Sequence, residues 1–337
     1  MGKAPEPRRI LLADMSAGGH HVHYLQQTLG SHAGEEVHIL APRQLVERVR
    51  GEFTWHPLPE GRCSRIGFAM AVRRVRRRIR PDMTVLLYAD YSQFALWVGG
   101  GLGGPGQTVA ALHSPGVFFS PGGSLRRRIR LGLDRWAMAC GNNGLCWRVH
   151  TRSAQAQLTG RVGAAGISMQ PYPHQQVAID RVEGQGYRQH MGIPERARLL
   201  LCFGGTRHEK GADLAASALS SLPSDCHLLI AGAKQDFGAE DLRTCAGAAV
   251  ERLHLDLRRI PDEELPRVFG AADVVLLPYR RAQCESGPLG TAILAGIPVV
   301  AAKASGWDPA VINQQGVWPF VLGDTQDMVR AIRQTRE

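Results

Sequence analysis

The stretch LLLCFGGTRHEKGADLAASAL, Leu199 to Leu219, joins an apolar run to an alanine-rich run through a polar turn punctuated by glycines. The apolar run has the composition of a buried strand, and the alanine-rich run that of a helix. The turn holds Arg207 and Lys210, and only four of the 40 cationic residues in the chain are lysines. We therefore expect Lys210 to have a role beyond that of a surface cation. The alternative is that both cations are solvated loop residues.

The same alternation recurs along the whole chain. Apolar runs followed by glycine or polar turns and then by helical patterns occur at 8–14, 36–42, 83–90, 108–114, 146–153, 199–205, 227–233, 272–279 and 296–303. Strands that alternate with helices are typical of parallel α/β sheets. The spacing restarts after the segment 169–197, which holds several prolines and glycines, so we expect the domain junction within it.

Length and composition limit the class of protein. A chain of 337 residues suits two domains, and we expect two Rossmann-like halves that face each other across a cleft, with ligands at the carboxyl ends of the strands. No apolar run reaches the ~18 residues that span a bilayer, and the first apolar run is too short for a signal peptide, so we expect a cytoplasmic protein. Seven scattered cysteines favour reduced thiols over disulfides or a zinc site. The net charge of +10 predicts an anionic partner, which could be nucleotide phosphate, lipid or nucleic acid.

Near the N-terminus, LLADMSAGGHHVHYLQQTL predicts a phosphate- or hydroxyl-binding turn. A strand should end near Asp14, and Gly18 and Gly19 should form a turn before a helix that begins around His20. A plain tight turn is the alternative. Two of the three histidines in this stretch share a helix face, but no carboxylate ligand is evident, so we expect no metal.

Two further features of the N-terminal half allow two interpretations each. His113 follows a strand and either projects into the expected cleft or is a satisfied loop histidine. The arginine runs AVRRVRRRIRPD (71–82) and SLRRRIRLGLDRW (124–136) have helical spacing with apolar residues interleaved. Most such runs are solvated helix faces, but a minority bind anionic membrane surfaces.

The stretch FGAADVVLLPYRRAQCESGPLGTAILAGIPVVAAK, 269–303, predicts a buried strand, a polar loop and a helix that ends at Gly296. Ser286 suits the helix N-cap, and Gly287 leaves room for the close approach of a ligand. The N–H groups and the positive dipole of a helix N-terminus bind phosphate. Together with Arg207 and Lys210, this helix end should bring positive groups to one point of the C-terminal half.

These motifs resemble the GT-B glycosyltransferases, most closely the retaining glycosyltransferase family 4, over nearly the whole chain. In that family a line of the form FG-x-x-R-x-x-K-G holds the donor diphosphate, and LLCFGGTRHEKGADL supplies Arg207 and Lys210 at those places. The family's SG-x-L-x-x-A-x-x-x-G-x-PVV helix is matched as well. The resemblance implies an acceptor-binding domain at 1–172, a nucleotide-sugar-binding domain at 185–325 and a C-terminal helix at 326–337.

Site residues follow from the resemblance by position. The implied catalytic residues are Arg207, Lys210 and His113, the last of these near the donor sugar. The implied donor-binding residues are Gly18, Gly19, Gly205, Glu285, Ser286, Gly287, Pro288, Leu289 and Thr291. Asp14, His20, Asp90 and Tyr91 are assigned to the acceptor from their places at strand ends.

The chain departs from the family pattern at the ribose contact. Many members carry two glutamates eight residues apart, whereas the best register here gives Gln283 and Thr291, with Glu285 offset by two. Threonine offers one hydroxyl where a carboxylate could accept two hydrogen bonds, so a deoxyribose donor is an open alternative. No D-x-D stretch occurs, which argues against a metal-dependent transferase of the other common fold.

The resemblance implies a hexosyltransferase that uses a nucleotide diphosphate sugar without a cofactor and retains the anomeric configuration. The acceptor would be a small molecule or natural-product sugar, or a lipid-linked glycan, and peripheral contact with the inner face of a membrane remains open. One alternative is a nucleotide-sugar epimerase or hydrolase of the same fold. Another is a basic membrane- or nucleic-acid-binding protein with a degenerate cleft, although no recognised nucleic-acid motif is present.

Overall fold

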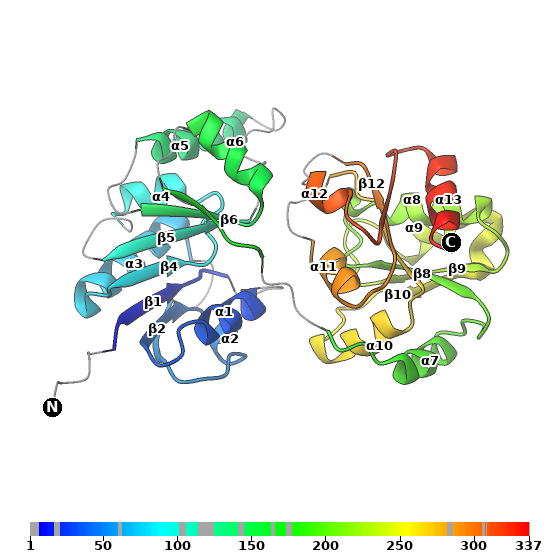
Figure 1. The fold of residues 1–337 in the computed structure, drawn as a ribbon, viewed down its shortest axis with the longest axis horizontal. Helices are drawn as coiled ribbons and strands as arrows, with labels where there is room; N and C mark the ends of the chain where they lie inside the picture. Colours follow the sequence, from blue (N-terminus) through cyan, green and yellow to red (C-terminus); the bar gives the residue numbers. More distant parts are fainter. Residues whose placement is uncertain are drawn as a thin grey trace. The chain divides into compact units, whose positions relative to one another are not determined.

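The computed structural model describes residues 7–16, 21–59, 63–100, 106–113, 125–140, 145–162, 166–172, 177–281, 286–304, 307 and 309–336. The chain divides into two compact units, Met1–Pro173 and His174–Glu337, and Figure 1 shows each as a sheet covered by helices. Each unit is a parallel α/β structure, which confirms the expected pair of Rossmann-like halves. Within the described ranges, none of the helices is both long enough and apolar enough to cross a bilayer.

The N-terminal unit has a seven-stranded sheet in the order β3-β2-β1-β4-β5-β6-β7. Its strands are β1 (Arg9–Ala13), β2 (Glu36–Ala41), β3 (Thr54–Pro57), β4 (Met83–Leu86), β5 (Gln107–Leu112), β6 (Leu145–Val149) and β7 (Ile167–Met169). Its helices are α1 (His21–Gly30), α2 (Arg43–Val46), α3 (Arg65–Ile79), α4 (Gln93–Val98), α5 (Leu125–Ala139) and α6 (Arg152–Val162).

The C-terminal unit has a six-stranded sheet in the order β10-β9-β8-β11-β12-β13. Its strands are β8 (Arg198–Phe203), β9 (Cys226–Ala231), β10 (Leu253–Asp256), β11 (Val274–Leu277), β12 (Val299–Ala302) and β13 (Val317–Phe320). Its α-helices are α7 (Arg181–His190), α8 (Ala212–Ala218), α9 (Ala239–Ala246), α10 (Leu265–Gly270), α11 (Gly287–Leu294), α12 (Pro309–Ile312) and α13 (Thr325–Gln334). Short 3₁₀ turns are η2 (His208–Lys210), η3 (Leu219–Ser221), η4 (Gly247–Arg252) and η5 (Asp262–Glu264).

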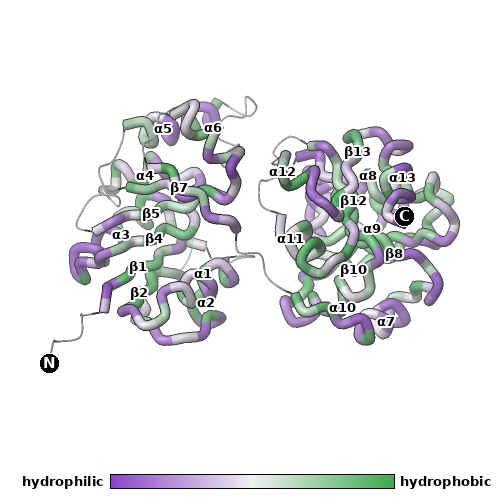
Figure 2. The backbone as a smooth tube through the Cα atoms, viewed as in Figure 1, coloured by the Kyte–Doolittle hydropathy of each residue, from purple (hydrophilic) through white to green (hydrophobic). Residues whose placement is uncertain are grey.

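Apolar strands explain why both sheets are buried on both faces. Along β8, Leu199 and Leu201 enter one core cluster, while Leu200 and Cys202 enter another, because successive side chains point to opposite faces. A strand that is apolar at every position suits a parallel sheet covered by helices on each side. In Figure 2 the hydrophobic colour accordingly gathers on the strands, and hydrophobic and hydrophilic residues alternate along the outer helices.

All nine strands expected from the apolar runs are present, and four more were missed. The missed strands are β3, β7, β10 and β13, which are the edge strands of the two sheets. The residues of β7 and β10 are all only partly buried, so an edge strand needs no continuous apolar run.

The strand order creates one switch point in each unit. The chain leaves β8 for β9 on one side and later returns to place β11 on the other side of β8. In open α/β sheets, ligands bind outside the carboxyl ends of the strands at such a point. The corresponding point in the N-terminal unit lies between β1 and β4.

Candidate active site

The turn after β8 is held in place by backbone contacts with its neighbours. Thr206 is fully buried, and its Oγ1 donates to the Phe237 carbonyl at 2.7 Å and accepts the Gln235 N–H at 2.9 Å. Gly211 has φ +72°, and a Cβ built there would lie 2.0 Å from the Pro278 carbonyl oxygen. Only glycine fits such a position, so the sequence forces the cationic turn against the end of β11.

Lys210 lies over an aromatic ring at this switch point. Its Nζ is 3.9 Å from the centroid of the Tyr279 ring, which is a cation–π distance. Tyr279 is buried, and its hydroxyl lies 3.3 Å from Ser286 Oγ. The Tyr279 ring also stacks in parallel on Trp307, with centroids 5.7 Å apart. Tyr279 therefore links the ammonium of Lys210 to the first turn of α11.

The start of α11 has the form that the sequence predicts. Ser286 is the N-cap, and its side chain accepts the Leu289 N–H at 3.4 Å. Nothing lies within 4 Å of a Cβ built at Gly287, so the helix end is open there. Pro288 occupies the first turn, where its missing N–H removes no helical hydrogen bond. Thr291 is buried on the same helix, 7% exposed.

Arg207 is half-exposed and forms an ion pair, 3.0 Å from its Nη1 to Glu209 Oε1. The turn is further fixed by Arg280, which donates two hydrogen bonds to Asp213, at 2.7 and 2.6 Å, and one to the His208 carbonyl. Burial alone would raise the pKa of Asp213, but the Arg280 hydrogen bond and charge lower it below its usual value. The two cations of the turn thus have different environments. Lys210 lies over a buried aromatic ring, and Arg207 lies beside a carboxylate.

Gly205 lies between this turn and the loop after β9. A Cβ built there would lie 2.7 Å from Gln235 Oε1, so a larger residue would displace that side chain. Burial raises the pKa of the neighbouring Cys202 thiol to about 12, although the charge of Lys210 acts in the opposite direction. This thiol is therefore neutral and belongs to the core.

In the N-terminal unit, the switch point is lined by aromatic and histidine rings. Asp14 follows β1 and accepts a hydrogen bond from His21 Nδ1 at 2.7 Å, and both side chains are buried. The His21 ring contacts Tyr88, which stacks on His113 with centroids 4.4 Å apart. Burial, followed by nearby acidic groups, raises the pKa of Tyr88, so the phenol stays neutral.

His113 is 3% exposed, and its Nε2 lies 2.7 Å from the Leu87 carbonyl oxygen, so Nε2 carries the proton and donates it. Asp90 accepts the His113 backbone N–H at 2.9 Å and fixes the end of β5. Tyr91 has φ +60°, and the Arg130 guanidinium lies 5.2 Å from its ring centroid. The structure thus gathers Asp14, Asp90 and His113 at the carboxyl ends of neighbouring strands.

Four of the predicted site residues lie outside the described residues: Gly18, Gly19, His20 and Glu285. The described residues contain no group of three or more His, Cys, Asp or Glu side chains that could hold a metal ion.

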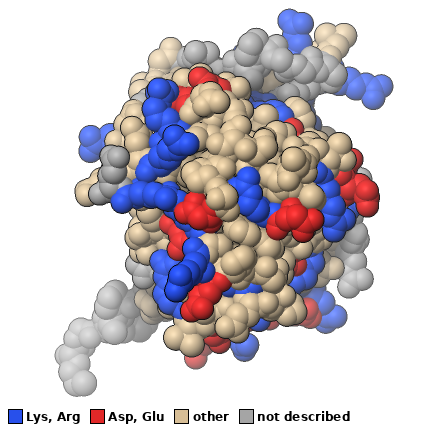
Figure 3. Space-filling view, turned by 90° about the vertical axis from the view of Figure 1, so that its right-hand side faces the viewer, with Lys and Arg blue, Asp and Glu red and all other residues tan. Residues whose placement is uncertain are grey.

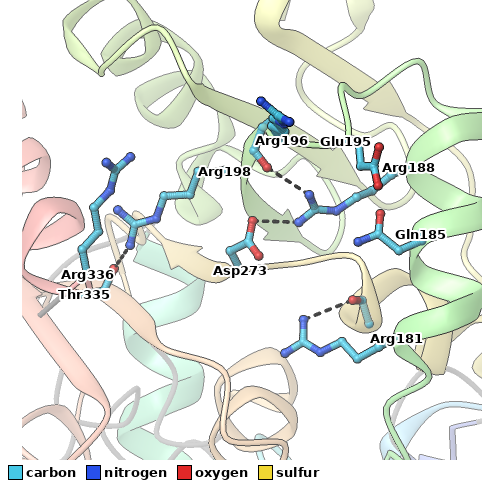
Figure 4. A pocket seen from close by; sticks show the side chains of 11 residues that line it. Arg181, Gln185, Arg188, Glu195, Arg196, Arg198, Asp273, Thr335 and Arg336 are labelled. Carbon is cyan, nitrogen blue, oxygen red and sulfur yellow. Dashed lines mark hydrogen bonds and ion pairs between the residues drawn. The ribbon is translucent and has the colours of Figure 1, made fainter.

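A basic pocket elsewhere in the C-terminal unit does not coincide with this site. Figure 4 shows its arginines at the amino end of β8, where Arg198 begins the strand. Arg181, Arg188 and Arg198 already donate to backbone carbonyls, which join α7 and α13 to the sheet. On the face of this unit seen in Figure 3, positive and negative side chains are mixed. The arginines of this pocket therefore have a structural role in the unit.

Comparison with known proteins gives a family match for the C-terminal unit and a fold match for the whole chain. Residues 197–337 match the family model described as "Glycosyl transferases group 1". Anabaena Alr3699/HepE, solved in complex with UDP and glucose, superposes with a TM-score of 0.70 at 18% identity over 98% of this chain and 90% of that one. The chain thus has the GT-B fold, and its C-terminal unit matches a glycosyltransferase family model.

Two further structures have the same GT-B fold. Sucrose-phosphate synthase from Thermosynechococcus elongatus has a TM-score of 0.71 at 18% identity, covering 97% of this chain and 89% of that one. WaaG, a glycosyltransferase involved in lipopolysaccharide biosynthesis, has a TM-score of 0.68 at 17% identity, covering 97% and 90%. No curated relative matches this chain by sequence.

The structure adds residues to the candidate site that sequence reasoning missed. Tyr279 and Trp307 form the stacked pair beneath Lys210, and Asp213 and Arg280 fix the turn. The signal for Tyr279 was present, because it ends the ADVVLLPY run at a strand terminus. Nothing in the sequence indicated Trp307, which lies 28 residues further along the chain.

Proposed function

We propose that this protein is a glycosyltransferase that moves a hexose from a nucleoside diphosphate sugar to an acceptor hydroxyl, with retention and without a metal. The leaving diphosphate gains negative charge as the glycosidic bond breaks. Fixed cations and helix dipoles stabilise such charge without reorganisation during the reaction. In this proposal Lys210, Arg207 and the first turn of α11 bind the diphosphate.

The observation that carries the proposal is the Lys210–Tyr279–Ser286 arrangement at the switch point of the C-terminal unit. It combines a half-buried ammonium, 3.9 Å from the Tyr279 ring centroid, with a helix N-terminus that is open at Gly287. A positive charge beside the positive end of a helix dipole suits a phosphate. The UDP and UDP-glucose bound to Anabaena HepE support a nucleotide sugar as the donor.

Arg207 would join the clamp by exchanging partners. Its ion pair with Glu209 is half-exposed and therefore contributes little to stability. A diphosphate carries more charge than one carboxylate and accepts two parallel hydrogen bonds from a guanidinium. We infer that the donor displaces Glu209 from Arg207.

The acceptor would bind to the N-terminal unit, where Asp14, Asp90 and Tyr91 lie at strand ends. Its hydroxyl would attack on the face from which the diphosphate leaves, which retains the configuration. His113 is proposed to contact the transferred sugar, supported by its place among the rings at the end of β5. A small molecule or natural-product sugar and a lipid-linked glycan are both acceptors in this proposal. We place the enzyme in the cytoplasm, supported by six described cysteines that are free thiols.

Thermal-shift measurements against a panel of nucleoside diphosphates test the donor. A ligand present at 100 times its dissociation constant stabilises the fold by about 2.7 kcal/mol, which gives a clear rise in melting temperature. The selected donor is then incubated with and without candidate acceptors, and free sugar, epimerised donor and glycosylated product are separated. Product that requires an acceptor supports the proposal. Turnover that is equal without acceptor would indicate a hydrolase or epimerase, and no shift with any diphosphate would contradict a nucleotide-sugar donor.

A further inference from the structure

The helices α3, α4 and α5 carry an exposed apolar surface that includes none of the candidate site residues. Eight of the eleven large apolar side chains that are exposed in the described part of the chain lie on these helices. They are Ile66, Met70, Trp97, Val98, Leu125, Ile129, Leu133 and Trp136, and we call them the apolar face. The other three, Val182, Leu294 and Val321, are spread over the C-terminal unit. Monomeric proteins seldom leave contiguous apolar surface without a partner.

The spacing along α5 shows that this face is continuous. Leu125, Ile129, Leu133 and Trp136 follow one another at helical intervals and are 71%, 56%, 38% and 47% exposed. The opposite side of α5 is buried: Asp134, 1% exposed, accepts the Phe94 N–H of α4 at 2.9 Å. The apolar stripe of α5 therefore faces outward by construction of the fold.

The neighbouring helices extend the stripe into a surface. The Trp97 and Trp136 rings meet edge to face, with centroids 4.7 Å apart, so α4 and α5 share an aromatic pair at the surface. A Cβ built at Gly99, just after α4, would lie 2.6 Å from Ala69 Cβ, which places α4 directly against α3. On α3, Ile66 and Met70 share a face with Arg73. All three helices thus contribute to the same surface.

The exposed charges that α3, α4 and α5 themselves carry have one sign. The sequence of α3 contains six arginines and no acidic residue, and that of α5 contains five arginines with the buried Asp134 as its single acid. Exposed Arg126 and Arg128 flank the apolar stripe of α5. The face of the C-terminal unit in Figure 3 differs, because cations and anions are mixed there.

We propose that the apolar face docks the enzyme on a bilayer that contains anionic lipid. Tryptophan rings favour the headgroup level, aliphatic side chains favour the acyl boundary, and arginines reach back to lipid phosphates. A protein partner would need acidic groups to match so many arginines. Two copies of this face would repel each other, because both carry positive charge. Charge complementarity therefore favours the anionic bilayer. The proposal does not rest on the transfer reaction, because binding is measured without donor or acceptor.

Co-sedimentation with vesicles tests this surface. The whole protein is mixed with vesicles of phosphatidylcholine alone or with phosphatidylglycerol, at low and high salt. We expect binding to the anionic vesicles that weakens as salt rises. Leu125→Ser/Ile129→Ser, at the two most exposed apolar positions of α5, should weaken binding at least about tenfold. The double variant Val182→Ser/Val321→Ser, in the other unit, should bind as the wild type does.

The charge contribution is tested separately. Arg126→Gln/Arg128→Gln should weaken binding by about fivefold for each arginine removed. Arg196→Gln/Arg333→Gln removes two exposed arginines of the C-terminal unit and should have no such effect. Circular dichroism and thermal unfolding check that each variant is folded.

Fluorescence tests the predicted depth of the two tryptophans. Lipids brominated near the headgroup should quench the wild type, whereas Trp97→Phe/Trp136→Phe should still sediment with vesicles but lose most of the quenching. Absence of binding to anionic vesicles at low salt would overturn the proposal, as would binding without quenching. A dimer in sedimentation equilibrium that Leu125→Ser/Ile129→Ser dissolves, together with no vesicle binding, would assign the face to a second copy instead.

Discussion

Replacement of Lys210 by methionine removes the ammonium but keeps a chain of similar length over the Tyr279 ring. If Lys210 binds the departing diphosphate, one charge-assisted contact worth about 1.5–3 kcal/mol is lost in the transition state. At about 1.4 kcal/mol per factor of ten, kcat/KM should fall by about ten- to 150-fold. The fold should remain, because a cation–π contact at a half-buried site contributes only about 0.5–1 kcal/mol out of a total of about 5–15.

The assay measures nucleoside diphosphate release against donor concentration, with calorimetric titration of the diphosphate in parallel. Lys303→Met is the matched control, since it removes an exposed lysine that follows β12 in the same unit. Lys210→Arg keeps the charge and can stack on Tyr279, so it should recover part of the activity. A kcat/KM for Lys210→Met within threefold of wild type, with an unchanged affinity for diphosphate, would refute the clamp.

The remaining predictions concern the ribose contact, the support of the turn and a histidine pair. The efficiency with a thymidine diphosphate sugar should lie within about tenfold of that with its uridine counterpart, because Thr291 can contribute one neutral hydrogen bond worth about 0.5–1.5 kcal/mol. Direct competition between the two donors measures this ratio, and a preference for the ribose donor above a hundredfold would contradict the prediction. Arg280→Gln should lower the melting temperature and weaken donor binding in titrations, because it breaks the bidentate pair with Asp213. The control Arg336→Gln breaks the more exposed pair with Asp225 and should leave donor binding unchanged. Equal effects of the two variants on donor binding would contradict a role for Arg280 in holding the turn. His254 Nδ1 donates to the Met191 carbonyl, so its Nε2 accepts from His227 Nδ1 at 3.0 Å. Burial lowers the pKa of both rings, and the neighbouring His254 lowers that of His227 further. The contribution of this pair to stability should therefore be fully present above the unfolded pKa of about 6.5 and should be lost as the pH falls below it. In thermal unfolding from pH 7.5 to 5, the melting temperature should decline less in His227→Gln than in wild type. Parallel curves would contradict this.

The central part of each sheet could be predicted from sequence, because buried parallel strands are apolar at every position. The run at Leu199 to Phe203 shows this, with both faces of β8 in the core. Edge strands carry no such signal. In β3, Thr54 and Pro57 are exposed while Trp55 and His56 are half-buried, so the segment resembles a loop in composition. Its place in the sheet depends on pairing with β2, which is a tertiary contact.

The candidate site was predictable only one segment at a time. Residue types and spacing identified the turn of Arg207 and Lys210, and separately the N-cap Ser286, because both are local features. Their meeting through Tyr279 depends on β11 lying beside β8, although Val274 comes 71 positions after Phe203 in the chain. That neighbour relation is a property of the strand order and has no local signature.

The arginine helices show the same division between local and tertiary information. Spacing alone predicts that α5 has an apolar stripe, and an apolar stripe of a surface helix normally packs on the core. Here the core instead takes the side with Leu131, Ala137 and Met138, and Asp134 is buried there too because the Phe94 N–H of α4 supplies its partner. Had that hydrogen bond been absent, burial of the carboxylate would have opposed this orientation. One backbone donor on α4 thus helps to decide which face of α5 is turned outward, and with it the position of Trp136.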